Sequence, residues 1–452
     1  MMEFDFSQEK PWQNREEIVM YRSKYNQKLA TPEKAVEDIN NSSTIVHGMA
    51  VGEPPALLAA IADRVKSGEL TDIKVFSLFP MEHCAKTILA PDLSDRILSY
   101  CWFVSPSDRG LVKVGLNYFV PNEFHQVPRL CRDFMEIDVT VTTVSPMDKA
   151  GFFSFGAIND YISTAARYCK KLIVEVNPNM PRVFGDSLLH VSEVDAIVEN
   201  EVPLLEIKPA EPRPEAETIG RYIADMVPDG ATIQLGIGGI PNTVCRYLEG
   251  HKNLGIHTEL FCPGMVHLIR KGVITGRKKN IHPWKHVFTN ALGDRDMYEF
   301  INDNPSMESY PVSYTNAPHV ISQNDDMISI NSTLEVDLLG QCNSEFLGGS
   351  QFSGTGGQLD YVRGAFHSKG GKSIIAFYST AHDGDVSRIM PRFDSGTVVT
   401  TPRMDTHYLA TEYGVVNLKG KSTRDRALDI ISLAHPKFRD DLLKEAENMY
   451  LM

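Results

Sequence analysis

Residues Gln234 to Val244 read QLGIGGIPNTV and begin like a dinucleotide-binding fingerprint. Gly236 and Gly238 stand at its first two glycine positions, but Pro241 occupies the third. The preceding apolar residues are typical of a buried strand, and proline is tolerated in the first turn of a helix. We predict a strand, a tight glycine turn and a helix. The amides of such a turn point toward an anion or a polarised oxygen, although a turn without a ligand remains open.

Strand-like and helix-like segments alternate along the whole chain. LIVEV (Leu172 to Val176) and SIIAFYS (Ser373 to Ser379) are β-branched or aromatic runs typical of strands. PALLAAIADRVKSG (Pro55 to Gly68) has apolar residues at helical spacing and a closing glycine, and the helix after the glycine turn is expected to carry Val244, Tyr247 and Leu248 on one face. This alternation predicts an α/β fold with largely parallel sheets.

The chain contains a possible internal repeat on either side of a proline-rich connection. Strand, glycine turn, proline and helix follow one another in TIVHGMAVGEPPALLAAIAD from Thr44 and again in TIQLGIGGIPNTVCRYLEG from Thr232. Between them, EIKPAEPRPEAET (Glu206 to Thr218) is predicted to be an extended connection. We therefore predict two related open α/β domains, residues 1–210 and 211–452, although chance recurrence of such turns in an α/β protein is the alternative.

Composition narrows the class of protein. The chain has 452 residues, 42% of them hydrophobic, and a formal net charge of -13, which disfavours binding to nucleic acid or anionic membrane. Its seven cysteines are scattered and never spaced as CxxC, so neither a disulfide framework nor a metal site is predicted. No signal-like or membrane-spanning run is present, so we expect a cytoplasmic protein.

One acidic residue interrupts the next apolar stretch, GIHTELFCPGMVHLI from Gly255. Most carboxylates in such positions are solvated or paired. Glu259 would differ if it ended a strand beside the glycine turn, because ligands bind outside the carboxyl ends of parallel strands. In that case the carboxylate would face a ring of backbone amides.

A second glycine-rich stretch, Asn343 to Phe377, precedes another predicted strand. It contains Gly348, Gly349, Gly354, Gly356 and Gly357. This density allows the backbone to approach a ligand closely and to form an amide nest for an oxyanion or phosphate. A flexible surface loop is the alternative, which we disfavour because Gln358, Asp360 and Arg363 offer internal hydrogen bonds.

Together these motifs resemble the 4-hydroxybutyrate CoA-transferase family, within the acetyl-CoA hydrolase/transferase proteins. The resemblance runs from about Tyr25 to Leu442. It rests on GIGGIPN (236–242), GIHTE (255–259), GTGGQLDY (354–361), SPMDKAGFFSFG (145–156), EVNPNMPRVFGDS (175–187) and TEYGVVNLKGKS (411–422).

The resemblance implies roles for particular residues. Glu259 would be the nucleophile, and the amides of Ile237 and Gly356 would form the oxyanion hole. CoA would lie against the turn formed by Gly236, Ile237, Gly238, Gly239 and Ile240, with Gly354, Gly357 and Lys369 as further CoA neighbours.

The implied reaction exchanges CoA between a short-chain acyl-CoA, of the 4-hydroxybutyryl or butyryl type, and a small acid such as acetate, through a glutamyl-CoA thioester. It needs no general base, so we interpret His47, His125 and His257 as satisfied polar or pocket-lining groups. Glu259 must be ionised to attack, so we expect no strongly raised pKa. No tightly bound cofactor or metal is expected, and the family suggests a homodimer or higher homo-oligomer.

Other functions remain open at this point. A short-chain acyl-CoA hydrolase would use the same glutamyl intermediate with water as acceptor. A ligand-binding protein could keep the glycine turns without needing Glu259, and a nicotinamide-dependent dehydrogenase is disfavoured by Pro241. In the first domain, HGMAVGEPP (from His47) and LNYFVPNEFHQVPRL (from Leu116) are either walls of the acyl pocket or segments with only a packing role.

Overall fold

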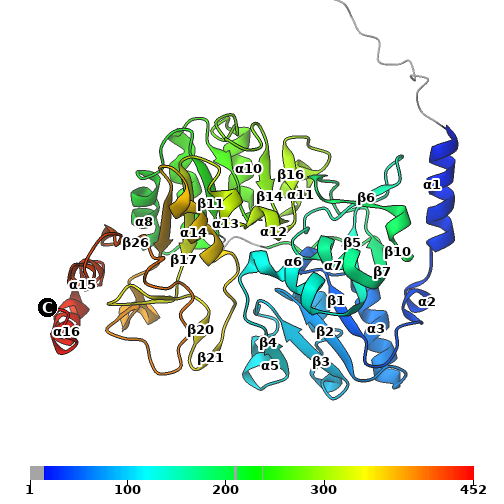
Figure 1. Cartoon of the computed structure of the whole chain (residues 1–452), viewed down its shortest axis with the longest axis horizontal. Helices are drawn as coiled ribbons and strands as arrows, with labels where there is room; N and C mark the ends of the chain where they lie inside the picture. Colours follow the sequence, from blue (N-terminus) through cyan, green and yellow to red (C-terminus); the bar gives the residue numbers. More distant parts are fainter. Residues whose placement is uncertain (1–14, 208–210, 237) are drawn as a thin grey trace, which may run out of the picture.

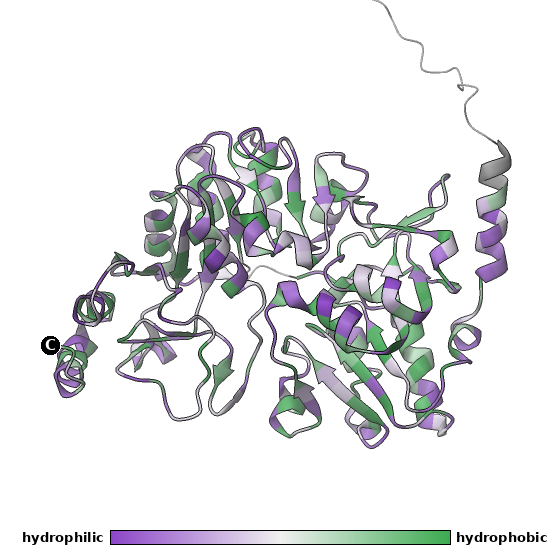
Figure 2. Cartoon of the chain, viewed as in Figure 1, coloured by the Kyte–Doolittle hydropathy of each residue, from purple (hydrophilic) through white to green (hydrophobic). Residues whose placement is uncertain are grey.

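The computed structural model describes residues 15–207, 211–236 and 238–452, and it shows two parallel-sheet halves side by side (Figure 1). We call residues 15–207 the N-terminal half and the described residues from 211 onward the C-terminal half. Helices α1 and α16 lie at opposite ends of the long axis (Figure 1). Apolar residues concentrate on the inner strands, whereas α1 is largely hydrophilic (Figure 2). No helix among the described residues is long and apolar enough to cross a membrane.

The N-terminal half is built on a seven-stranded sheet, all parallel, in the order β10-β7-β5-β1-β2-β3-β4. Its central strands β1 and β5 are buried on both faces, as is typical of parallel sheets, whereas β2 and β3 alternate buried residues with more exposed ones. The strands of this half are β1 (Thr44–His47), β2 (Ile73–Ser77), β3 (Ile97–Cys101), β4 (Asn117–Phe119), β5 (Ile137–Val144), β6 (Phe152–Ser154), β7 (Cys169–Val176), β8 (Phe184–Gly185), β9 (Leu188–His190) and β10 (Ala196–Glu199). Its helices are α1 (Arg15–Lys28), α2 (Pro32–Val36), α3 (Pro55–Ser67), α4 (Glu82–Ala85), α5 (Arg109–Lys113), α6 (Val127–Arg129) and α7 (Ile162–Tyr168).

The C-terminal half has a six-stranded sheet in the order β12-β11-β17-β22-β26-β27, in which only β27 is antiparallel. The strands of this half are β11 (Thr232–Leu235), β12 (Gly255–Ile256), β13 (Leu260–Phe261), β14 (His286–Phe288), β15 (Asn290–Ala291), β16 (Met307–Ser309), β17 (Met327–Ser332), β18 (Glu335–Asp337), β19 (Cys342–Asn343), β20 (Phe346–Leu347), β21 (Ser350–Gln351), β22 (Lys372–Ala376), β23 (Thr380–Ala381), β24 (Val386–Ser387), β25 (Ile389–Met390), β26 (Tyr408–Thr411) and β27 (Gly414–Asn417). Its helices are α8 (Glu215–Ala224), α9 (Gly239–Tyr247), α10 (Pro263–Arg270), α11 (Arg295–Ile301), α12 (Val312–Thr315), α13 (Pro318–Ile321), α14 (Gln358–His367), α15 (Thr423–Ser432) and α16 (Pro436–Asn448).

The predicted α/β class and the parallel sheets are confirmed. In each half the strand before the glycine turn, β1 or β11, lies between the next strand of the sequence, β2 or β12, and a later strand, β5 or β17. The N-terminal sheet differs in continuing beyond β2 with β3 and β4. This shared order agrees with the predicted relationship between the halves. Helix α3 also matches its prediction, since Leu57, Ile61 and Val65 are buried and Gly68 closes the helix with φ of 82°.

Short backbone pairings join the two halves. Strand β8 of the N-terminal half pairs in parallel with β16 of the C-terminal half. The amide of Ala291 donates to the carbonyl of Ala157 at 2.7 Å, and the amide of Asn159 donates to the carbonyl of Thr289 at 3.1 Å. A single buried apolar cluster contains residues of both halves, so the surface between them is part of the core.

Three local predictions are wrong. Residues Glu215–Thr218 of the predicted extended connection begin helix α8. Tyr247 is 38% exposed and its hydroxyl donates to Glu217, so it does not share the buried face of α9. Gly348 and Gly349, both with positive φ, form the exposed turn of the β20–β21 hairpin, which is a surface turn of the kind that we disfavoured for this stretch.

Candidate active site

Glu259 follows β12, the neighbour of β11, at the carboxyl edge of the C-terminal sheet. Its backbone carbonyl accepts hydrogen bonds from the amides of Thr289 at 3.2 Å and Asn290 at 2.9 Å. These bonds fix the backbone at the point where the chain passes from β12 to β13. The placement beside the turn that follows β11 is the one the sequence analysis required for a functional carboxylate.

The Glu259 carboxylate is held by two nitrogen donors. The side-chain amide of Asn316, immediately after α12, donates to Oε2 at 2.6 Å. The backbone amide of Gly357 also donates to the carboxylate. A Cβ atom at Gly357 would lie 1.9 Å from Oε2 of Glu259 and 2.2 Å from Nδ2 of Asn316, so only glycine fits there.

The electrostatic setting of Glu259 differs from our expectation. Burial raises its pKa from an ordinary value of 4.5 to about 7, and the nearby charges of Asp360 and Asp160 add to this, while the bonds from Asn316 and Gly357 oppose it. The prediction of a pKa without strong elevation is therefore wrong. The Glu259 carboxyl group would be only partly ionised near neutral pH.

Glu259 opens into a cavity of about 170 Å3 between the two halves. The C-terminal half contributes Gly236, Gln234, Asn331, Gly356 and Gly357. The N-terminal half contributes a largely apolar wall, made of Met49, Leu78, Phe79, Trp102, Phe103, Asn122 and Phe124. Both N-terminal segments proposed as pocket walls therefore reach the cavity, through Met49 in one and through Asn122 and Phe124 in the other.

Some of the predicted CoA neighbours line this cavity and others lie in the segments that flank it. Gly236 and Gly357 line it, and Gly354 packs against Phe103. Gly238 precedes α9 with φ of 127°, and Gly239 lies against Pro212 and Tyr378. Ile240 has a buried side chain in the first turn of α9.

The two remaining predicted site residues are Ile237 and Lys369. The prediction for Ile237 falls outside the described residues. Lys369 follows the carboxyl end of α14, whereas the amino end of that helix faces Glu259. The Lys369 side chain is 88% exposed and lies 3.7 Å from Asp325.

Three side chains of the second glycine stretch bond to distant segments of both halves and not within their own loop. Asp360 accepts from Nδ1 of His125 at 2.6 Å and from the amide of His125 at 3.1 Å. Arg363 donates to Glu123 and to Asp405, and Gln358 donates to Thr401. Our expectation of internal hydrogen bonds is therefore wrong, because the partners come from distant segments.

The three histidines have the polar partners that we expected. The ring of His47 hydrogen-bonds to the carbonyl of Gly48, and that of His257 to the carbonyl of Thr315, and both are fully buried. Glu123, His125 and Asp360 are also close enough together to meet the spacing of a metal site. Arg363 already provides a cation to this group.

Comparison with known proteins agrees with this geometry. The acetyl-CoA hydrolase/transferase N-terminal domain matches residues 13–206, and the corresponding C-terminal domain matches residues 293–446. The succinyl-CoA:cyclohexane-1-carboxylate CoA transferase of Geobacter metallireducens is 44% identical over 95% of this chain and 97% of its own length. The chain belongs to the acetyl-CoA hydrolase/transferase family.

Further relatives within this family support the same assignment. The 4-hydroxybutyrate coenzyme A transferase of Clostridium kluyveri is 44% identical over 94% of this chain and 99% of its own length. The crystal structure of RipA from Yersinia pestis is 50% identical, covers 96% of this chain and all of its own, and superposes with a TM-score of 0.93. The predicted family, the CoA-transferase fold and the enzyme class are thereby confirmed.

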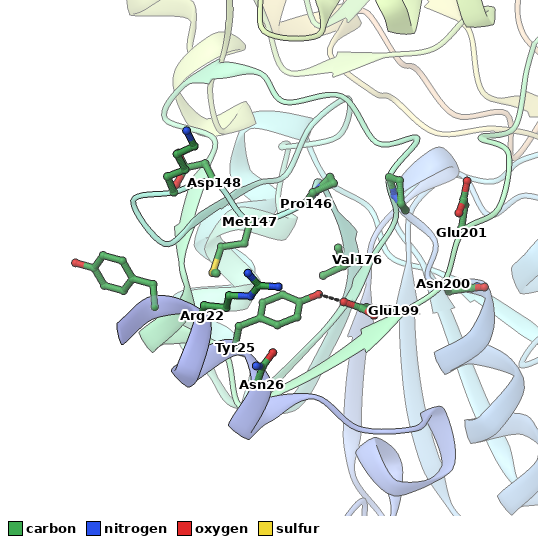
Figure 3. A pocket seen from close by; sticks show the side chains of 13 residues that line it. Arg22, Tyr25, Asn26, Pro146, Met147, Asp148, Val176, Glu199, Asn200 and Glu201 are labelled. Atoms are coloured by element: carbon green, nitrogen blue, oxygen red, sulfur yellow. Dashed lines mark hydrogen bonds between the residues drawn. The ribbon is translucent and has the colours of Figure 1, made fainter. Parts of the chain in front are cut away.

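A larger pocket of about 650 Å3 lies elsewhere in this acetyl-CoA hydrolase/transferase chain, between α1 and the carboxyl ends of β5, β7 and β10. Figure 3 shows Tyr25 of α1 bonded to Glu199, at 2.6 Å, beside Arg22 and Met147. None of the residues that we predicted for the active site lines it. The smaller cavity is therefore the candidate active site, because it alone of the two contains a carboxylate held by backbone and side-chain amides.

The sequence analysis missed Asn316, Phe103 and Trp102. Trp102 and Phe103 follow β3, so a search for residues at the carboxyl ends of predicted parallel strands could have found them. Asn316 gives no comparable signal, because it lies in a short helical connection far from Glu259 in sequence.

Proposed function

We propose that this chain transfers CoA between a short-chain acyl-CoA, of the 4-hydroxybutyryl or butyryl type, and a small carboxylic acid such as acetate. The observation that carries the proposal is the Glu259 carboxylate, bonded to Asn316 and the Gly357 amide, inside a largely apolar cavity. CoA is a substrate in this proposal, and no tightly bound cofactor is required.

The chemistry proceeds in two halves through Glu259. Its carboxylate attacks the thioester carbonyl, the carbon–sulfur bond breaks, and CoA thiolate leaves a mixed anhydride. The thiolate then attacks the glutamyl carbonyl, which releases the first carboxylate and leaves a glutamyl-CoA thioester. The acceptor acid reverses these steps. In every step the nucleophile and the leaving group are a carboxylate or a thiolate, so no proton transfer and no general base are needed.

Backbone amides of the two glycine segments would stabilise the negative oxygen that each addition creates. We assign this role to the amides of Gly356 and Ile237, and the loss of one such donor typically costs about 2.7 to 4 kcal/mol of transition-state stabilisation. Gly356 has φ of 54°, which glycine adopts without strain. Its carbonyl accepts from the amide of Phe124 at 3.3 Å, so the N-terminal half holds this peptide in place.

The cavity favours an acid over water as acceptor. Trp102, Phe103, Phe79 and Phe124 make its wall apolar, which limits access of water to a reactive anhydride or thioester. Its volume of about 170 Å3 suits a short acyl chain. The CoA arm would pass along the turn from Gly236 to Ile240 and by Gly354. We further propose that the protein is cytoplasmic and forms a homodimer or a larger homo-oligomer.

The test is an intact-mass spectrum after incubation with butyryl-CoA, followed by borohydride reduction and peptide mapping. We expect a CoA-sized adduct in the intact-mass spectrum. Because borohydride reduces the thioester to an alcohol and releases CoA, we expect a reduced glutamate at position 259 in the peptide map, and both signals should be absent from Glu259→Gln. Glu199→Gln is the matched control, because it removes a carboxylate from the larger pocket of Figure 3. An adduct that survives in Glu259→Gln would overturn the mechanism, and thioester loss independent of added acetate would indicate hydrolysis.

A further inference from the structure

Two carboxylates compete for one amide at the candidate active site. Nδ2 of Asn316 lies 2.6 Å from Oε2 of Glu259 and 3.5 Å from Oδ2 of Asp360. Asn316 and Asp360 are both fully buried. Because the two acids are close and share a single donor, a negative charge on Asp360 disfavours ionisation of Glu259 and raises its pKa.

The cation that balances Asp360 comes from the other half of the molecule. Nδ1 of His125, in the short helix Phe124–Gln126, lies 2.6 Å from Oδ1 of Asp360, and the His125 amide donates to Oδ2 at 3.1 Å. Glu123 lies 3.7 Å from the same ring nitrogen and is itself paired with Arg363. Burial alone would lower the pKa of His125, but the hydrogen bond and charge of Asp360, with Glu123, outweigh burial and raise it.

The same segment touches the proposed oxyanion peptide. Phe124 lines the cavity and its amide bonds to the carbonyl of Gly356. The groups that act electrostatically on Glu259 are Asn316, Asp360 and Asp160, with the amide of Gly357. No cationic side chain among the described residues forms an ion pair with Glu259, so the nearest balancing charge acts through Asp360.

We propose that His125 is a positioning residue for the nucleophile, whose imidazolium neutralises Asp360 so that the Asn316 amide stays with Glu259 and Glu259 can ionise. The inference rests on the proposed role of Glu259. It also gives the N-terminal half an electrostatic function in addition to its apolar wall.

The first test compares the acid limb of the kcat/KM profile in His125→Asn and Asp360→Asn. The asparagine at 125 can keep a donor near the position of Nδ1 but carries no charge. We expect the apparent pKa of this acid limb to rise by roughly one pH unit in His125→Asn, which lowers kcat/KM at pH 6.5 by up to about tenfold. In Asp360→Asn we expect the apparent pKa to fall. Titration of the substrate cancels, since every variant uses the same acyl-CoA.

The double variant decides whether His125 acts through Asp360. If it does, the His125→Asn/Asp360→Asn profile matches that of Asp360→Asn alone. His267→Gln is the matched control, because it breaks an exposed His–Glu pair of 2.8 Å far from the cavity. A pH-independent loss of activity in His125→Asn, with no movement of the limb, would overturn the inference and leave a merely structural role.

A second readout does not depend on turnover. A protonated carboxylic acid gives an infrared carbonyl band. The part of this band that is lost in the Glu259→Gln variant belongs to Glu259 and reports its protonation directly. Its midpoint should rise in His125→Asn and fall in Asp360→Asn, and an unchanged midpoint would contradict the inference. A protein that shows these shifts but no CoA adduct would instead refute the proposed function.

Discussion

Glu259 faces two conflicting demands as a single side chain. In the proposed reaction it must be ionised to attack a thioester, yet its burial raises its pKa to about 7. The two donors from Asn316 and Gly357 recover part of the cost of burying the charge. The amides of Asn316 and Gly357 therefore limit the rise in the pKa of Glu259 that its burial causes.

Glycine at position 357 is expected to be essential. In Gly357→Ala the new Cβ would collide with Oε2 of Glu259 and displace the carboxylate. We expect kcat/KM to fall by about 100-fold or more, comparable to the loss of an oxyanion donor. The control is Gly110→Ala, where a Cβ meets nothing within 4 Å. A Gly357→Ala enzyme with wild-type rates of glutamyl-CoA formation would contradict this geometry.

The raised pKa of Glu259 also predicts an effect on stability. A carboxyl group whose pKa is higher in the folded state than in the unfolded state lowers the free energy of unfolding as pH rises between the two values, here from 4.5 to about 7. Glu259→Gln should therefore be more stable than wild type at pH 8, by about 1 to 3 kcal/mol, with the gain vanishing toward pH 4.5. Denaturant titrations at both pH values measure this difference, and a gain that does not vary with pH would refute it.

At the scale of elements, the short helix α12 places Asn316 beside Glu259. Asn316 follows α12 directly, and the carbonyl of Thr315, the last residue of α12, accepts from the Tyr361 hydroxyl at 3.1 Å and from Nε2 of His257 at 2.8 Å. Tyr361 lies on α14, the helix whose amino end follows Gly357. The end of α12 is thus fixed by the helix that carries the second glycine segment.

Removing the Tyr361 hydroxyl should loosen this arrangement. In Tyr361→Phe the ring still fills its buried site, but one of two donors to Thr315 is lost. We expect a destabilisation of about 1 to 2 kcal/mol and a severalfold lower kcat/KM through misplacement of Asn316. Tyr450→Phe, at an exposed position, is the control. Unchanged kinetics with lowered stability would show that α12 does not position Asn316.

At the scale of the whole molecule, the halves are not independent units. One apolar cluster includes Met49 and Ile158 of the N-terminal half together with Leu235 and Ala291 of the C-terminal half. The pairing of β8 with β16 crosses the same boundary. The cavity exists only where these surfaces meet, since its apolar wall and Glu259 come from different halves.

This shared core predicts cooperative unfolding. We expect one calorimetric transition for the full chain, and we expect residues 211–452 alone to bind an apolar dye and aggregate, because separation exposes the apolar surface between the halves. Calorimetry and dye binding measure both. Two separate transitions, with a well-folded C-terminal fragment, would show that the halves fold independently. The predicted boundary near residue 210 stays a prediction until such fragments are made.

The sequence by itself determined what depends on local order along the chain. Alternating apolar runs, the glycine turn before α9 and the position of Glu259 were sufficient for the α/β class and for the resemblance to a family, because strand and helix periodicity and turn chemistry are encoded by neighbouring residues. Tertiary structure alone decided the placement of Asn316 and Asp360 beside Glu259, the bond from His125 to Asp360 and the raised pKa of Glu259. These depend on burial and on contacts between segments far apart in sequence, and no periodic pattern records which distant side chains will share one cavity.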